Sequence, residues 1–234
     1  MTRSALPTPL LAGLALALAG SASAATYTNV PAGANTGLPF ASFGNSPNPS
    51  GDSPMVGEVF ALGSNETLSS FSFYAIGNQS LPLTLNIAQW NPGTNAQNQA
   101  VNTIGATLVA TSSAAESFNA TSGVTTLEFD NLGFTVSPGT KYVAFLSSND
   151  PGVTGIQLSR TQTTQDATGF GIGNAYLGTV PGQGWQLPFA GSGFLSLQYT
   201  AVVSAVPEPD AAAMALAGLG VLGFLARRRK AARA

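Results

Sequence analysis

The chain has 234 residues, of which only 8% are charged, and it carries 27 glycines and 15 prolines, a composition that suits a cell surface or a secreted matrix. It contains neither cysteine nor histidine, which excludes disulfides, His-based triads, Cys nucleophiles and His or thiolate metal sites. Residues 25–205 hold two basic and eight acidic side chains, so we expect no nucleic-acid partner.

The first 24 residues are organised as a secretory leader. Arg3 and the α-amine form a short positive region, and an apolar stretch runs from Leu10 to Ala19. The small residues Ala22-Ser23-Ala24 then form a signal-peptidase site. The sequence therefore predicts a signal peptide over residues 1–24, with Ala22 and Ala24 as its cleavage-site residues and Ala25 as the first mature residue.

The middle of the chain predicts strands. Residues 25–55 are rich in Pro, Gly, Asn and Ser, which favours loops or edge strands. From Val56 to Ser148 apolar and polar residues alternate, as in the stretch LSSFSFYAIG, and the later runs GIQLSR and GFLSLQYTAVV behave likewise. Turn clusters such as Asn91-Pro92-Gly93 separate the runs. We find no amphipathic helix here. Half-buried strands, each with one face toward the core and one toward solvent, are expected at this spacing, and they predict one all-β domain over residues 56–205, an antiparallel β-sandwich with less than a tenth helix.

Candidate catalytic and metal-binding residues are few. Glu128 and Asp130 stand two apart, so in a strand they share a face, and a glycosidase pair is conceivable. They follow an apolar run and precede a turn, however, which favours a solvated face. Four further acids supply oxygen atoms that Ca²⁺ could use, but they lie in no calcium-loop motif: Asp52, Glu58, Asp150 and Asp166. We therefore predict a protein that is not an enzyme, with no catalytic residue, metal or cofactor.

Trp90 and Trp185 are the two tryptophans of the chain, and both lie near turn residues, in QWNPG and GQGWQLP. Exposed aromatic rings stack on sugar rings in carbohydrate-binding sandwiches, so both residues are candidates for glycan stacking. Trp90 shares a strand pattern with apolar neighbours, which favours a core position. Trp185 lies among Gly, Pro and Gln and is the better candidate for an exposed ring.

The last 29 residues form a second targeting segment. Residues 211–226 carry no charge and would span about 24 Å as a helix, a short transmembrane segment beside a hydrocarbon core of about 30 Å. Four basic residues follow it as a membrane stop: Arg227, Arg228, Arg229 and Lys230. The positive-inside rule puts this tail, residues 227–234, in the cytoplasm. The domain before it is then outside the inner membrane, as the leader also predicts.

The order of Val206-Pro207-Glu208-Pro209, an apolar span and a basic tail resembles the PEP-CTERM sorting signal of Gram-negative bacteria. The resemblance covers residues 206–234 and implies that Pro207, Glu208 and Pro209 are recognised by an exosortase, a membrane transpeptidase. It also implies that the span is a temporary anchor in the inner membrane, and that the mature protein reaches the cell surface or an exopolysaccharide or biofilm matrix. Independently, the two prolines keep this peptide out of helix and open to an enzyme.

The stretch from LSSFSFYAIG through VSPGTKYVAF resembles the jelly-roll sandwiches of exported PEP-CTERM proteins, which are similar to carbohydrate-binding modules. Two functions follow for the domain at residues 56–205. One is a non-catalytic surface or matrix protein, and the other is a glycan-binding module that tethers itself to exopolysaccharide. An exposed aromatic platform would favour the second function, and burial of both tryptophans would favour the first.

Overall fold

The computed structural model describes residues 24–32, 37–44, 52–80, 82–94, 96, 101–111, 115–161, 168–177, 184–186, 196–206, 216, 218–223 and 228. Of these residues, 59% lie in strands or bridges and 5% in helix, which confirms the all-β prediction. The chain divides into two compact units. Ala24–Ala205 form one unit, which holds all the described strands, and residues 1–23 and 206–234 form the other.

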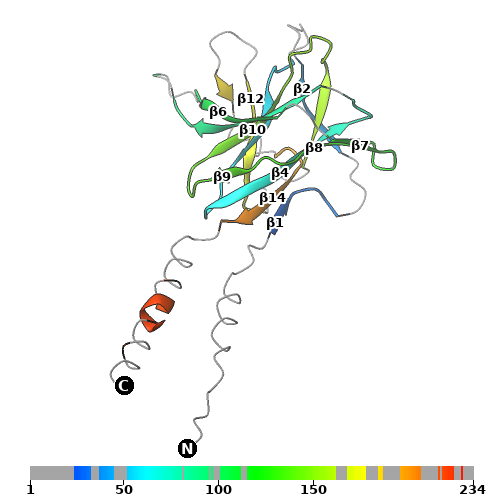
Figure 1. The fold of residues 1–234 in the computed structure, drawn as a ribbon. Helices are drawn as coiled ribbons and strands as arrows, with labels where there is room; N and C mark the ends of the chain where they lie inside the picture. Colours follow the sequence, from blue (N-terminus) through cyan, green and yellow to red (C-terminus); the bar gives the residue numbers. More distant parts are fainter. Residues whose placement is uncertain are drawn as a thin grey trace, which may run out of the picture. The chain divides into compact units, whose positions relative to one another are not determined.

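The strands build two sheets (Figure 1). Sheet A contains β1 (Ala24–Thr28), β2 (Leu38–Phe43), β4 (Glu66–Ile76), β7 (Ala115–Asn119), β8 (Val124–Phe129), β9 (Phe134–Val136), β11 (Ile156–Arg160) and β14 (Tyr199–Ala205). Sheet B contains β3 (Val56–Phe60), β5 (Thr84–Asn91), β6 (Thr103–Thr111), β10 (Tyr142–Ser147), β12 (Gly171–Leu177) and β13 (Trp185–Gln186). The paired strands in both sheets are antiparallel, as predicted.

The long strand β4 is the centre of sheet A. On one side it pairs with β14 and then, at Ala75, with β11. On its other side it pairs with β9 and then with β8. The strands β1, β2 and β7 continue the sheet beyond β14, β11 and β8. The segment 25–55, expected to hold loops or edge strands, thus supplies β1 and β2, which lie at the two ends of the path β1-β14-β4-β11-β2.

The main core lies between the two sheets. Along β4, Phe71, Phe73 and Ala75 are fully buried and alternate with more polar residues. In sheet B, Phe60 stacks on Phe170 with a centroid distance of 4.8 Å and an angle of 6° between the rings. Phe71 in turn lies 5.7 Å from the ring of Tyr199. Because the chain has no cysteine to cross-link its sheets, packing in this core, including these aromatic pairs, holds the sheets together.

Sheet B also has apolar side chains on its opposite face, where the sequence pattern predicted solvent. All five residues of β3 are buried, and so are five of the six in β10. A second cluster covers this face: Val59, Ala88, Trp90, Val143, Phe145, Ala175 and Trp185. The prediction of half-buried strands is therefore wrong for β3 and β10. The physical reason is that the segment with β13 packs Trp185 against the ring of Phe145 on this face.

One buried carboxylate joins the sheets. Glu58 of β3 alternates with Val59, so its side chain shares the inter-sheet face with Val56 and Phe60, and it is fully buried. Its Oε2 atom accepts the backbone N–H of Leu197, just before β14, at 2.9 Å. This buried hydrogen bond fixes the entry of the chain into β14.

The strand β1 is held mainly by β14. Tyr27 pairs with Ala201 and stacks on Phe170 at 5.1 Å. Beyond the strand, Asn29 accepts the N–H of Tyr199 at 2.9 Å and donates to the carbonyl of Leu197 at 2.8 Å. Burial first, and then the negative charge of Glu66, raises the pKa of Tyr27 above its ordinary value of 10.0.

The close approach of β3 and β10 requires glycine at position 57. A Cβ atom there would collide with the carbonyl oxygen of Ala144 and lie 2.6 Å from Cα of Phe145. We expect Gly57→Ala to lower the free energy of unfolding by about 1–3 kcal/mol or more, because the sheet must open to admit the methyl group. Urea denaturation measures this. Gly63→Ala is the matched control, since no atom lies within 4 Å of that Cβ position, and an equal loss in both variants would contradict the explanation.

The raised pKa of Tyr27 predicts a loss of stability at alkaline pH. The folded state binds this proton more tightly than the unfolded state, so the contribution is complete below about pH 10 and is lost as the pH rises through the folded-state pKa. We expect the free energy of unfolding to fall more steeply in the wild type than in Tyr27→Phe between about pH 9 and pH 12. Parallel curves for the two proteins would show that Tyr27 does not contribute.

Candidate functional site

The end of β14 leads directly into the proposed sorting region. Ala205 pairs with Glu66 of β4, and Ser204 pairs with Ala24 of β1, so the strand is held on both sides almost to its end. Val206 follows, and Pro207 begins the predicted motif. The motif is therefore attached, through a single intervening residue, to a strand that the sheet fixes in place.

Most of the predicted sorting residues lie outside the residues that the structure describes: Ala22, Pro207, Glu208, Pro209, Arg227, Arg229 and Lys230. Beyond Val206, the structure describes Leu216, residues 218–223 and Arg228, which are helical and exposed. Within the described residues, no helix combines the length and apolar character needed to cross a membrane.

Both tryptophans are buried, with 3% of Trp90 and 4% of Trp185 exposed. The expectation that Trp185 presents an exposed ring for glycan stacking is therefore wrong. Its indole ring packs edge-on against Trp90 at 6.1 Å and against Phe145 at 5.1 Å. Neither indole ring has a face open to a sugar, and burial of the pair favours the packing interpretation over the stacking one.

Hydrogen bonds to the backbone of Trp185 fix the segment that contains β13. Its N–H donates to the carbonyl of Asn102 at 3.0 Å, and the Asn102 side-chain amide donates to the carbonyl of Trp185 at 3.1 Å. Gly184 permits this approach, because a Cβ atom there would lie 2.7 Å from the Asn102 carbonyl oxygen. The segment is thus pinned by an asparagine that lies 83 positions earlier in the chain, a contact that local sequence patterns do not predict.

The candidate acidic residues either accept hydrogen bonds from backbone N–H groups in loops or lie exposed on the surface. Asp52 accepts the N–H of Gly155 at 3.0 Å, and Asp150 accepts the N–H of Gly152 at 2.8 Å within its own turn. Glu128 and Asp130 are exposed on sheet A, as the apolar run before them and the turn after them predicted. Among the described residues, no three acids gather closely enough to hold a metal ion. Asp166 lies outside the described residues.

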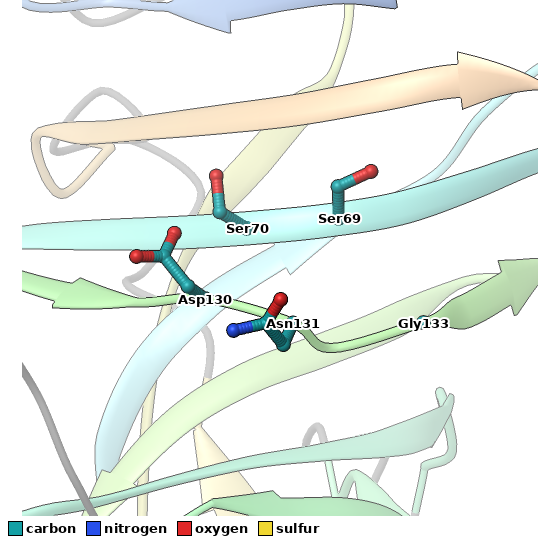
Figure 2. A pocket seen from close by; sticks show the side chains of 5 residues that line it. All are labelled: Ser69, Ser70, Asp130, Asn131 and Gly133. Atoms are coloured by element: carbon teal, nitrogen blue, oxygen red, sulfur yellow. The ribbon is translucent and has the colours of Figure 1, made fainter.

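A shallow polar hollow of about 580 Å³ lies on sheet A at the point where β4 changes partner from β8 to β9. Figure 2 shows the side chains of Ser69, Ser70, Asp130 and Asn131 around it, with Gly133 at its edge. The Leu132 N–H donates to the Ser69 carbonyl at 3.0 Å, and Asn131 adopts a left-handed backbone with φ 58°. These groups offer hydroxyl, amide and carboxylate oxygen atoms to solvent.

The hollow was not predicted, although the sequence of β4 contains a signal for it. The buried residues Leu68 and Phe71 are three apart, whereas the rest of β4 alternates with a period of two. The extra residue forms a bulge opposite Val202 and Val203, where the pairing with β14 shifts register. A break of the alternation at LSSF therefore marks the site.

Comparison with known proteins identifies a sorting motif in the C-terminal region of the chain. Residues 205–230 match the family model described as the PEP-CTERM protein-sorting motif. No curated protein and no solved structure matches the chain. The chain thus carries a PEP-CTERM motif, which marks a surface-exported protein whose membrane-anchored precursor is processed by an exosortase.

The burial of Trp185 predicts a structural role. We expect Trp185→Ala to lower the free energy of unfolding by about 3–5 kcal/mol, the usual cost of truncating a buried tryptophan. Thermal or urea denaturation measures the loss. Leu108→Ala is the control, because Leu108 of β6 is 53% exposed, and it should change stability little. A stable Trp185→Ala protein that loses affinity for a glycan would restore the stacking role.

Proposed function

We propose that the protein is an exported, non-catalytic surface or matrix protein of a Gram-negative bacterium, released from the inner membrane by an exosortase. The match at residues 205–230 carries this proposal. In the proposed order of events, residues 1–24 direct export and are removed. The body then folds outside the inner membrane, residues 211–226 anchor it, and the basic tail holds the anchor until Pro207, Glu208 and Pro209 are recognised.

The division of the chain supports this order. One compact unit runs from Ala24 to Ala205, and the other contains the two regions assigned to targeting. The first boundary falls within one residue of the expected signal-peptidase cleavage, and the second lies just before the sorting motif. All pairs of β1 from Ala25 to Thr28 survive the loss of residues 1–24. Processing at either end therefore leaves the two sheets and their core intact.

The short connection between β14 and the motif limits where the enzyme can act. A fully extended chain advances at most about 3.6 Å per residue, so Pro207 lies within about 7 Å of Ala205. After residues 1–24 are removed, β14 stays paired with β4 up to Ala205 and with β1 up to Val203, so the folded body must stand beside the exosortase while the motif is read. The body is therefore part of the surface that the enzyme meets.

A non-catalytic body agrees with its chemistry. The sequence lacks histidine and cysteine, and the described acids Asp52, Glu58 and Asp150 hold backbone N–H groups in place. Glu128 and Asp130 are exposed on the surface of sheet A. We infer a role through binding or structure, with exopolysaccharide as the matrix partner.

The proposal predicts the fate of two precursor variants in an exosortase-bearing host. Replacing Pro207, Glu208 and Pro209 with alanine removes the recognition peptide, so uncleaved precursor should accumulate. Neutralising Arg227, Arg228, Arg229 and Lys230 removes the cytoplasmic stop of a short span, so the yield of cleaved protein should fall by more than half. Intact-mass analysis of the cell exterior and of the membrane fraction measures both results.

The control for the tail variant is Arg233→Gln, which removes one positive charge outside the cluster and should be processed normally. Wild-type yields of cleaved protein from the alanine variant would contradict exosortase recognition. Wild-type yields from the neutral tail alone would show that the apolar span fixes its own depth in the bilayer.

A further inference from the structure

The outer face of sheet A is covered with hydroxyl groups. Side chains that alternate with the buried core residues of β1, β14, β4 and β8 point to this face. We call the surface formed by six hydroxyl-bearing residues among them the hydroxyl face: Thr28, Thr200, Ser70, Ser72, Tyr74 and Thr126. Ser72 is only 6% exposed and lies beneath its neighbours. The strands of the six residues are adjacent in the sheet, although residue 28 and residue 200 lie 172 positions apart.

The pairing register aligns these hydroxyls in rows across the strands. Thr28 pairs with Thr200, Thr200 pairs with Ser72, and Tyr74 pairs with Thr126. The Thr200 hydroxyl lies 2.9 Å from the hydroxyls of both Thr28 and Tyr74, so three strands share one chain of hydrogen bonds. A hydroxyl both donates and accepts, and this chain fixes the positions of groups that would otherwise rotate freely.

The polar hollow extends the hydroxyl face at its β8–β9 side. Ser70 belongs to both, and Figure 2 shows its hydroxyl and the carboxylate of Asp130 pointing to the same side of the sheet. A carboxylate beside hydroxyl and amide groups accepts hydrogen bonds from neighbouring hydroxyls of a ligand, and these charge-assisted bonds are the stronger ones. The hollow therefore adds strong acceptors to a surface of weaker donors and acceptors.

Charge decides which kind of ligand fits. Glu128 and Asp130 are exposed here, whereas the two basic residues of the body, Lys141 and Arg160, lie outside β1, β14, β4 and β8. Such a face repels polyanions, including nucleic acids and polyuronates. It also lacks the large apolar patch that marks many protein interfaces, since the exposed large hydrophobic residues among the described strands lie on other strands: Leu108, Phe118 and Ile172.

We propose that the hydroxyl face, together with the polar hollow, binds a neutral, hydroxyl-rich polysaccharide. This inference rests on the proposed export of the protein to an extracellular matrix, and it names the chemical class of the matrix partner. The polysaccharide lies flat on the paired strands, exchanges hydrogen bonds with the rows of hydroxyls, and places one sugar unit against Asp130. Each contact is weak, and retention comes from many contacts made together.

The test measures retention of the full chain, in detergent micelles, on insoluble neutral β-glucan and on an insoluble polyuronate. The variant Thr200→Val with Ser70→Ala removes the centre of the hydrogen-bonded chain and one side of the hollow. The matched control, Thr103→Val with Ser137→Ala, makes the same chemical changes at exposed positions outside sheet A. We expect the first variant to bind the β-glucan about tenfold more weakly, as two lost hydrogen bonds imply, and the control to bind within about twofold of wild type.

Three results would overturn the proposal: no binding of the wild type to β-glucan, equal binding by the first variant and the wild type, or equal retention on the polyuronate. Thermal unfolding of both variants checks that the sheet is intact, and a variant that unfolds is replaced by Ser70→Ala alone, where weaker binding is again expected. Export and cleavage of the first variant should match wild type. The two readouts are therefore separate. β-Glucan retention tests this inference, and cleavage of the precursor tests only the proposed processing.

Discussion

The hydrogen bond from the Leu197 N–H to Glu58 is the contact on which the rest of the domain depends. It ties the chain entering β14 to the centre of sheet B, inside a core where an unsatisfied polar group would cost several kcal/mol. Around it, Thr161 donates its N–H to Ser196, and Gln198 donates to Ser159. From this fixed segment β14 continues between β1 and β4, and its register with them determines which side chains form the outer surface of sheet A.

The sequence predicted sheet A well and sheet B poorly, for a physical reason. In sheet A one face meets the core and the other meets solvent, so the period-two pattern of Phe71, Phe73 and Ala75 can be recognised directly. In sheet B, β3 and β10 are covered on both faces, so consecutive residues are buried and a period-two pattern cannot indicate which of them face the core. What covers them includes Trp185, from a stretch whose Gly, Pro and Gln composition indicates only a loop. Nothing local in that stretch signals its bond to Asn102.

The sorting region and the hydroxyl face differ in how they could be found. A sorting signal is read as a linear peptide, so the order of motif, apolar span and basic cluster can be recognised from residues 206–234 alone. The hydroxyl face is assembled from Thr28, Ser72 and Thr200, which strand pairing brings together from distant parts of the chain. Serine and threonine are frequent throughout this sequence, and only the register shows which of them share a surface.

The position of β14 has a mechanical consequence. A pull on the chain beyond Ala205 reaches the domain through β14, which is hydrogen-bonded to β4 on one side and to β1 on the other. Drawing the strand out lengthwise loads both rows of hydrogen bonds in shear, so that many bonds must break together, whereas peeling an edge strand breaks them one at a time. Forced unfolding is governed by the rate of crossing such a barrier. Its pairing on both sides therefore makes β14 resistant to a lengthwise pull from the end of the fold that leads into the sorting motif.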